Sequence, residues 1–319
     1  MNSLSVPNHI PVLLCFDANY ADYAAVATYS AHKNSKSNIV FYWLFTPEVE
    51  ERSKRLRESL QKLGMRINLL VFDVSHLNHW KTGLHFTTAS YLRLFAPDLL
   101  TNEDKLLYLD CDTLVLTDVM SLYNTPLQDA RFAGCIDETG GKTSRVPRVA
   151  GDKYINSGVL LMDLKALRND GVVERCKMLY EQFKNEITWP DQCLINKYAE
   201  GRKLILDPKY NRQIFTFRIK ASDFNDLTKP QNSSILHFVG GTKPWQSWCN
   251  PCIAEFWWAY ANDLQIDNLK PTQITTINQL VALADVLDLN SQYEEASKIK
   301  TQAIQALFKH LAEINSRSN

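Results

Sequence analysis

The chain has 319 residues, of which 45% are hydrophobic and 22% charged, so it can bury a substantial core. Its formal net charge is zero, which gives no general attraction to nucleic acid. No apolar run approaches the ~20 residues of a transmembrane helix, the amino end lacks signal-peptide features, and the seven cysteines follow no disulfide-framework spacing. We therefore expect a cytoplasmic protein with one large α/β domain, alone or with an appendage.

Apolar strands and helices alternate over the first 72 residues. A β-α-β-α-β order is typical of a parallel sheet with right-handed crossovers, in which ligands bind beyond the carboxyl ends of the strands. Asp17, Asn19 and Tyr20 follow the first strand at that edge. The predicted elements are strands at 10–16, 39–45 and 66–72, a helix ending near residue 33, and a helix with Thr46 as its N-cap that ends at Gly64.

Two carboxylates, Asp110 and Asp112, close the apolar segment that begins at Leu106. In an extended strand, alternation puts both on one side of the backbone, where they repel each other and favour a divalent cation with oxygen ligands. The alternative is a strand end whose acids face water. The same triplet also resembles the nucleophile motif of haloacid-dehalogenase-type phosphatases, although three strands precede it and no clear acidic pair follows.

The central part of the chain contributes further polar residues to this predicted sheet. A helix over 87–95 carries Arg93, which is either a surface charge or a cation aimed at the same edge. The polar segment 137–153 is predicted to be a long loop, a candidate lid. The remaining predicted elements are strands at 131–136 and 154–162 and helices at 164–186 and 191–200.

A short strand ending at His237 opens into Gly240, Gly241 and Lys243. Backbone N–H groups and an ammonium at such a corner suit a phosphate group. His237 is either a core residue or a ligand that completes the shell of the cation. The nearby Trp248–Cys252 segment looks like a thioredoxin-type redox motif, but it follows a loop rather than a strand, and Pro251 is expected to open a helix.

Residues 272–319 show apolar side chains at helical spacing and are predicted to form a helical hairpin. We expect a catalytic domain over 1–265 and a helical extension over 266–319. The hairpin could pack on the catalytic domain, lie on a membrane surface or contact a partner, and its composition is not especially basic.

Together these pieces resemble glycosyltransferase family 8, the retaining family that includes glycogenin and bacterial lipopolysaccharide galactosyl- and glucosyltransferases. The resemblance covers roughly residues 10–262, and its motifs occur in the order of the family. They are the segments 16–20, 87–93, 108–112, 154–161, 190–192 and 237–245.

The resemblance implies a GT-A type, Rossmann-like nucleotide-binding fold with a mixed, mainly parallel sheet, to which the helical hairpin predicted from the apolar spacing is added. It also implies a UDP-hexose donor, a glycan or glycolipid acceptor such as lipopolysaccharide core, no nucleic acid partner, and Mn²⁺ or Mg²⁺. The hairpin lies outside the resemblance; if it does not pack on the catalytic domain, a self-association or inner-membrane contact is expected there. The metal ligands would be Asp110, Asp112 and His237.

The remaining residues take their expected roles from the same resemblance. Asp17, Asn19 and Tyr20 would contact uracil and ribose. The other nucleotide-site residues would be His85, Arg93, Cys111, Gly240 and Lys243, and the catalytic residues beside the donor hexose would be Asn156, Asp191 and Gln192. Cys193 stands where many relatives have an acid, which leaves Asp191 as the one carboxylate for a covalent intermediate. We therefore expect front-face attack by the acceptor hydroxyl.

Overall fold

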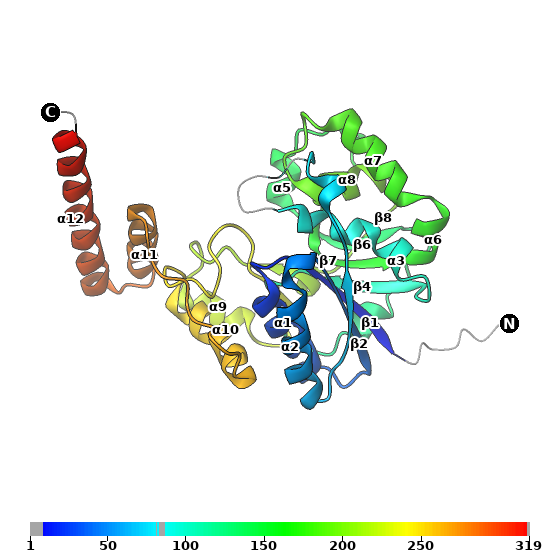
Figure 1. Cartoon of the computed structure of the whole chain (residues 1–319), viewed down its shortest axis with the longest axis horizontal. Coiled ribbons are helices and arrows are strands. Elements are labelled where there is room, and N and C mark those ends of the chain that lie inside the picture. Colours follow the sequence, from blue (N-terminus) through cyan, green and yellow to red (C-terminus); the bar gives the residue numbers. More distant parts are fainter. Residues whose placement is uncertain (1–8, 81, 83–86, 318–319) are drawn as a thin grey trace. The chain divides into compact units, whose positions relative to one another are not determined.

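The computed structural model describes residues 9–80, 82 and 87–317 (Figure 1). The chain divides into two compact units. The first comprises the residues up to Arg212 together with Ser233–His237, and the second comprises Gln213–Asn232 and the residues from Phe238 onward. Among the described residues, no helix combines the length and the apolar character needed to cross a membrane.

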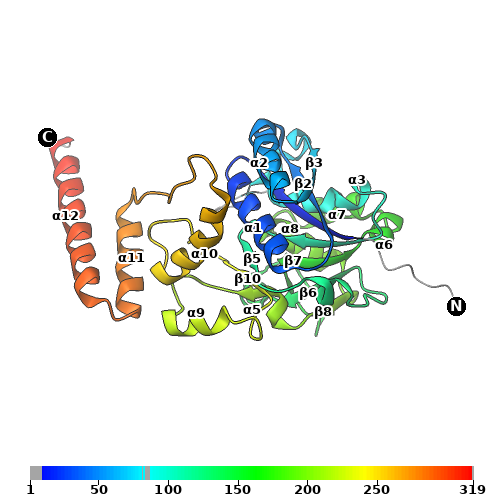
Figure 2. The same cartoon turned by 90° about the horizontal axis from the view of Figure 1, so that it is seen from below.

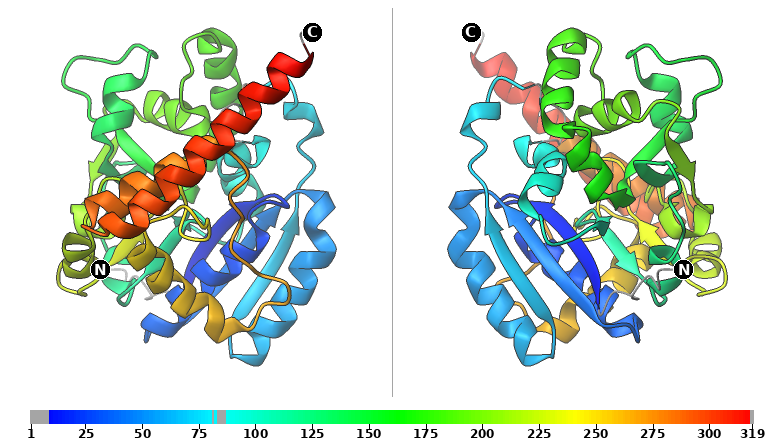
Figure 3. Two further views of the ribbon diagram at one scale, coloured as in Figure 1. Left: turned by 90° about the vertical axis from the view of Figure 1, so that its left-hand side faces the viewer. Right: turned by 90° about the vertical axis from the view of Figure 1, so that its right-hand side faces the viewer.

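A seven-stranded sheet with the order β3-β2-β1-β4-β7-β6-β8 organises the first unit. The strands β1 to β4 run parallel, whereas β7 is antiparallel to both of its neighbours, β4 and β6. Figure 3 shows β1, β2 and β3 side by side in blue. These strands are β1 (Ile10–Phe16), β2 (Ile39–Phe45), β3 (Arg66–Val71), β4 (Lys105–Leu109), β6 (Phe132–Ile136), β7 (Ile155–Asp163) and β8 (Lys203–Ile205). The expected mixed, mainly parallel sheet is confirmed.

A second sheet of three short strands has the order β5-β10-β9. The strand β10 (Ile235–His237) runs antiparallel to β5 (Thr113–Val115) and pairs His237 with Thr113. The third strand is β9 (Arg212–Gln213). This sheet joins a late segment of the chain to the segment that directly follows β4.

Both faces of the large sheet are covered at β1, which explains why this strand is a continuous apolar run rather than an alternating one. On one face, α1 (Ala21–Asn34) meets the sheet, and its Thr28 accepts a hydrogen bond from the indole of Trp43. On the other face, Leu13 and Tyr108 share a core with residues of η3, α7 and α8. The helices of this unit besides α1 are η1 (Pro47–Val49), α2 (Glu50–Lys62), η2 (Ser75–Leu77), η3 (Thr88–Phe95), α3 (Ala96–Leu99), α4 (Met120–Tyr123), α5 (Glu138–Thr143), α6 (Leu164–Asn169), α7 (Val172–Phe183), α8 (Pro190–Tyr198) and η4 (Pro208–Asn211).

The second unit is helical. Its two last helices run side by side as the expected hairpin (Figures 1 and 2). A capping box opens the first of them, because Thr276 and Gln279 exchange side-chain and backbone hydrogen bonds. The helices are α9 (Ala221–Leu227), α10 (Pro251–Leu264), α11 (Ile277–Leu289) and α12 (Tyr293–Arg317).

Several boundaries differ from those predicted from the sequence. Thr46 stands at the N-cap position as predicted, but of the 3-10 turn η1 and without a side-chain cap hydrogen bond, because its hydroxyl donates to Glu48 instead; α2 begins only at Glu50. The helix predicted over 87–95 is the 3-10 helix η3. The helix predicted over 164–186 is interrupted at Gly171, whose positive φ of 64° suits glycine.

The segment predicted to be a long loop over 137–153 contains a helix. Asp137 caps α5 by accepting a hydrogen bond from the backbone N–H of Gly140 at 2.6 Å. The prediction missed this helix because two glycines, Gly140 and Gly141, lower its intrinsic propensity. An N-cap aspartate stabilises it.

Candidate active site

Asp110 and Asp112 lie in a turn between β4 and β5, not in an extended strand as predicted. Two hydrogen bonds hold the turn: the backbone N–H of Asp110 donates to Gly158 O at 2.7 Å, and the Thr113 hydroxyl donates to Asp110 O at 2.7 Å. Both carboxylates face the same side chain, His237. The turn, rather than strand alternation, is therefore the reason why they converge.

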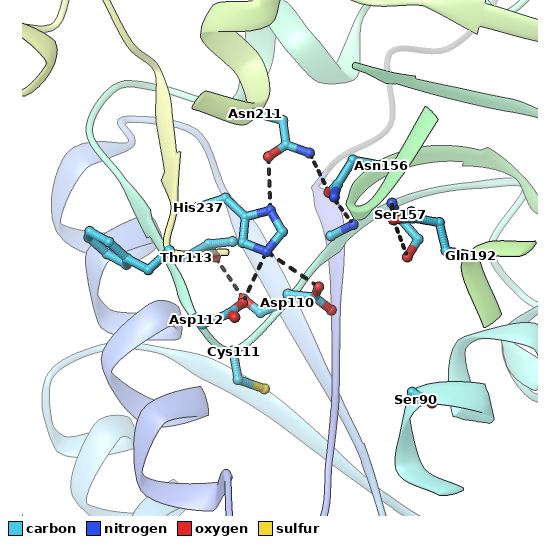
Figure 4. A network of polar contacts seen from close by, with 12 residues as sticks. Ser90, Asp110, Cys111, Asp112, Thr113, Asn156, Ser157, Gln192, Asn211 and His237 are labelled. Carbon is cyan, nitrogen blue, oxygen red and sulfur yellow. Dashed lines mark hydrogen bonds and ion pairs between the residues drawn. The ribbon is translucent and has the colours of Figure 1, made fainter. Parts of the chain in front are cut away.

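His237 reaches this turn because β10 pairs with β5. Its Nε2 lies 3.3 Å from Asp112 Oδ1 and 3.6 Å from Asp110 Oδ2. One ligand atom from each of the three residues falls within 4.8 Å of the others (Figure 4). Two carboxylates and an imidazole in a largely buried position form a donor set that fits a divalent cation such as Mn²⁺ or Mg²⁺.

Gly158 of β7 makes room for this arrangement. A Cβ atom at this position would lie 2.1 Å from His237 Cε1 and 2.7 Å from Asp110 Oδ2. No side chain larger than hydrogen fits there without displacing the imidazole or the carboxylate. Glycine is therefore required at this position by the close approach of the β7 backbone to the site residues.

Arg93 lies between two carboxylates of the site and is buried rather than on the surface. Its Nη2 is 2.9 Å from Asp110 Oδ1, and its Nε is 3.3 Å from Asp191 Oδ2. The guanidinium also donates to Ser157 O at 2.7 Å and covers the ring of Tyr108 at 4.1 Å. Burial disfavours its charge, but Asp110 and Asp191 outweigh this effect and raise the pKa of Arg93.

Asp191 stands in the first turn of α8 and is 3% exposed. Burial raises the pKa of this carboxyl group, although Arg93 acts in the opposite direction. Its neighbour Gln192 is held by two contacts: its Oε1 accepts from Ser157 N at 2.9 Å, and its Nε2 donates to Asp137 Oδ2 at 3.1 Å. The first turn of α8 therefore presents both expected residues to the start of β7.

Asn156 shares a hydrogen-bond partner, Asp137, with Gln192. Its Nδ2 donates to Asp137 Oδ2 at 3.1 Å, while its Oδ1 accepts from the N–H of Gly158 and from Asn211 Nδ2, both at 2.9 Å. The structure thus brings together Arg93, Asn156, Asp191 and Gln192 around the β7 strand.

Asp17, Asn19 and Tyr20 follow β1, the strand next to β4. Asp17 is buried, and its carboxylate accepts from the N–H of Asn19 at 2.9 Å. The pKa of the Tyr20 phenol is raised by burial and by the charge of nearby Asp112, so this ring belongs to the surroundings of the acid pair. The Cys111 thiol donates to Cys15 O at 3.4 Å, which ties the turn to β1.

Lys243 and Gly240 belong to the second unit. Lys243 is 4% exposed and donates from Nζ to Phe238 O at 2.7 Å. Gly240 has a positive φ of 86°, a conformation that other residues rarely adopt. His85, the remaining expected nucleotide contact, lies outside the described residues.

Sequence reasoning missed two buried residues of this site, Asp137 and Asn211. Asp137 directly follows β6, so the rule that singled out Asp17 and Asp110, a polar residue at the end of a buried strand, could have found it. Asn211 ends the short η4 helix and carries no comparable signal.

The Trp248–Cys252 segment shows no sign of a redox centre. Asn250 caps α10, as its side chain accepts from Cys252 N, and burial raises the pKa of the Cys249 thiol to about 12. A reactive thiol needs a lowered pKa.

Comparison with known proteins decides the family. The model of glycosyl transferase family 8 matches residues 11–249. The chain belongs to this family. This assignment confirms the resemblance and supports glycosyl transfer over the phosphatase alternative.

General stress protein A of Bacillus subtilis (strain 168) is 28% identical over 251 residues, which cover 74% of this chain and 87% of the relative. Lipopolysaccharide 1,2-glucosyltransferase of Escherichia coli (strain K12) is 28% identical over 245 residues, which cover 73% of this chain and 71% of that relative. Other relatives are longer: the chain spans 34% of GlyA and 54% of GlyF of Streptococcus pneumoniae.

A crystal structure of galactosyltransferase LgtC in complex with donor and acceptor sugar analogues has a TM-score of 0.70 to this chain. The match covers 81% of this chain and 97% of LgtC at 24% identity. This likeness confirms the GT-A type fold of the family 8 glycosyltransferase.

Proposed function

We propose that this glycosyltransferase moves galactose or glucose from a UDP-sugar to a glycan or glycolipid acceptor, with retention at the anomeric carbon and with Mn²⁺ or Mg²⁺. The observation that carries the proposal is the convergence of Asp110, Asp112 and His237 in a family 8 chain. Two relatives support the substrate class: one is named for glucosyl transfer to lipopolysaccharide, and LgtC was solved with sugar analogues.

Asp110, Asp112 and His237 would hold the cation. When bound, a divalent ion offsets the negative charge that develops on the departing diphosphate. Arg93 balances the charge of Asp110 from the other side, because its Nη2 is 2.9 Å from Asp110 Oδ1. The positive charge of Arg93 thus reduces the repulsion among the three neighbouring carboxylates Asp110, Asp112 and Asp191.

For the nucleotide we propose the contacts that the resemblance to the family implies. Asp17 would accept from the uracil N–H, and Asn19 and Tyr20 would contact base and ribose. Cys111, Gly240, Lys243 and His85 would complete the nucleotide site, with Lys243 and backbone N–H groups binding the diphosphate.

We propose front-face attack by the acceptor hydroxyl. The bond between the anomeric carbon and the phosphate oxygen breaks, the acceptor oxygen bonds to that carbon, and its proton passes to the departing UDP. Support comes from Asp191, which is 3% exposed and paired with Arg93, a poor arrangement for a nucleophile. Asn156 and Gln192 would contact the donor hexose. Trapping a glycosyl–Asp191 intermediate would contradict this mechanism.

The domain boundary stays a proposal: catalytic residues within 1–265 and a helical extension over 266–319. The extension exposes apolar side chains along α12 and would contact either the inner membrane or a second copy from the cytoplasmic side. The exposed side chains include Ile304, Leu307, Phe308, Leu311 and Ile314. Sedimentation with lipid vesicles and mass measurement in solution distinguish the two contacts.

The test of the proposed function is incubation with a panel of UDP-hexoses, with and without Mn²⁺. We expect UDP release from UDP-galactose or UDP-glucose that stops when a chelator is added. Undiminished release with the chelator would contradict metal dependence. Release of phosphate from simple monoesters, without UDP-sugar turnover, would favour the phosphatase.

A further inference from the structure

A chain of buried hydrogen bonds connects Asp137 to His237 through two amide side chains. Its links are Asp137 Oδ2 to Asn156 Nδ2 at 3.1 Å, Asn156 Oδ1 to Asn211 Nδ2 at 2.9 Å, and Asn211 Oδ1 to His237 Nδ1 at 3.0 Å. The four residues are 2–8% exposed. Figure 4 shows Asn211 between His237 and Asn156.

Asp137 sets the direction of the first amide. An ionised carboxylate only accepts hydrogen bonds, so Asn156 must turn its NH₂ group toward Asp137. A second, independent constraint agrees: the backbone N–H of Gly158 only donates, and it meets Asn156 Oδ1 at 2.9 Å. The orientation of Asn156 is therefore determined at both ends.

Asn156 then sets the direction of Asn211. Because the carbonyl oxygen of Asn156 faces Asn211, Asn211 must present its NH₂ group there and its own oxygen to His237. A flipped Asn211 would place two carbonyl oxygens together in a buried position, which costs about as much as leaving a polar group unpaired.

We infer that this hydrogen-bond chain keeps a proton on His237 Nδ1 and so reserves Nε2, the nitrogen that faces Asp110 and Asp112, for the cation. Asn211 and Asp137 are then positioning residues of the proposed metal site. Neither has its side chain among the proposed ligands. The inference rests on the proposed function for the identity of the cation, but not for the tautomer.

This hydrogen-bond chain is needed because the acid pair by itself favours the Nε2–H tautomer of His237, which cannot bind a metal through Nε2. Two carboxylates lie 3.3 and 3.6 Å from Nε2 and attract a proton to it. A proton on Nε2 occupies the lone pair that a metal needs. The oxygen of Asn211 opposes this, because a bare Nδ1 would then face a carbonyl oxygen.

The first test is the affinity for Mn²⁺ alone, measured by calorimetry or by electron paramagnetic resonance without nucleotide. We expect Asn211→Ala to weaken binding about 10–100-fold, the range found when partners of ligating histidines are removed. Asp137→Asn should weaken it too, because its new NH₂ group opposes the NH₂ group of Asn156. This second variant keeps the proposal testable if Asn211→Ala does not fold.

Asn196→Ala is the matched control. Asn196 is 1% exposed and makes three hydrogen bonds to the start of β7 and to α8, outside the hydrogen-bond chain. It should lower the melting temperature while leaving Mn²⁺ affinity unchanged. Equal loss of affinity in all three variants would overturn the inference, since a general loosening of the site would then explain it.

The second test is nitrogen-15 NMR of the seven histidines in metal-free protein near pH 9, where an ordinary imidazole is neutral. His237→Gln assigns the resonance. We expect a protonated Nδ1 in the wild type and a gain of the Nε2–H form in Asn211→Ala. If neutral His237 of the wild-type protein carries its proton on Nε2 instead, the inference is overturned. If wild-type protein binds no Mn²⁺, the proposed metal dependence fails, whereas the NMR result still judges the tautomer.

Discussion

Two clusters of carboxylates and cations in the first unit differ in their balance of charge. In the Asp170 cluster, one carboxylate receives Arg131 at 2.7 Å, Arg202 at 2.9 Å and the Tyr198 hydroxyl at 2.9 Å. In the acid-rich cluster, the carboxylates Asp110, Asp112 and Asp191 share Arg93 and His237.

The difference separates structural from functional polar groups. The Asp170 cluster satisfies its carboxylate with its own side chains, and the Arg131 hydrogen bond lowers the pKa of Asp170 well below its usual range. The acid-rich cluster has more acids than side-chain cations, and its third acid, Asp191, has a raised pKa owing to burial. A bound cation would stabilise the acid-rich cluster by offsetting its excess negative charge, whereas the Asp170 cluster has no such excess.

The largest effect is expected from Asp112→Asn, which removes a carboxylate from the acid-rich cluster. Transfer should fall by on the order of a thousandfold, the loss typical of removing a group that stabilises developing charge. The metal-free protein should keep its melting temperature, because repulsion with Asp110 is relieved. UDP release and thermal unfolding measure the two effects, and near-normal transfer would contradict the site.

Gly158→Ala should have the next largest effect. The added methyl group would lie 2.1 Å from His237 Cε1, so the imidazole must move. We expect a loss of about 1–3 kcal/mol in stability from overpacking, together with loss of Mn²⁺ binding.

Gly134→Ala in β6 is the control for Gly158→Ala. Its Cβ would meet Ile155 and Leu160 side chains at 3.1 Å, in the core and not in the site. It should cost stability without changing Mn²⁺ affinity. If both variants bind Mn²⁺ normally, Gly158 is not needed to place His237.

Arg93→Lys keeps the charge but removes the planar fork that joins Asp110 to Asp191. Transfer should fall about 10–100-fold, because one ammonium cannot make both contacts and also donate to Ser157 O. Turnover of UDP-sugar by the folded variant measures this. A variant with wild-type turnover would show that transfer depends on the total charge of this cluster and not on the two contacts of the planar guanidinium.

The smallest effect on activity is expected from Asp170→Asn, which should leave transfer and Mn²⁺ affinity unchanged. It should cost about 1–2 kcal/mol of stability near pH 7, since partly exposed ion pairs contribute little more. The lowered folded pKa means that Asp170 stabilises the wild type above its unfolded pKa of about 3.9, and that this is lost as the pH falls further.

Melting temperatures between pH 7 and pH 2.5 test this. The gap between wild type and Asp170→Asn should begin to narrow below about pH 3.9 and should go on narrowing as the pH falls toward the lowered pKa of Asp170. A gap that widens in acid would reverse the assignment of the pKa shift.

Local sequence determined much of the fold. The predicted strands 10–16 and 39–45 match β1 and β2 residue for residue, because both are continuous apolar runs between polar segments. The positions of Asp17 and Asp110 beyond neighbouring parallel strands followed from the same pattern. Capping and helix type were less predictable, as Thr46 and η3 show, because they depend on contacts outside the local window.

The sequence by itself thus specified the parallel βαβ half, the terminal helical hairpin and the motifs of the family. Only the tertiary structure decided how His237, 125 positions after Asp112, meets the acid pair, that Arg93 is buried between two carboxylates, and which way the amides of Asn156 and Asn211 point. These features depend on the antiparallel strands β7 and β10, whose partners lie far away in the chain. Hydrophobic periodicity records which residues are buried, but it carries no information on which distant strand they meet or on the direction of a hydrogen bond.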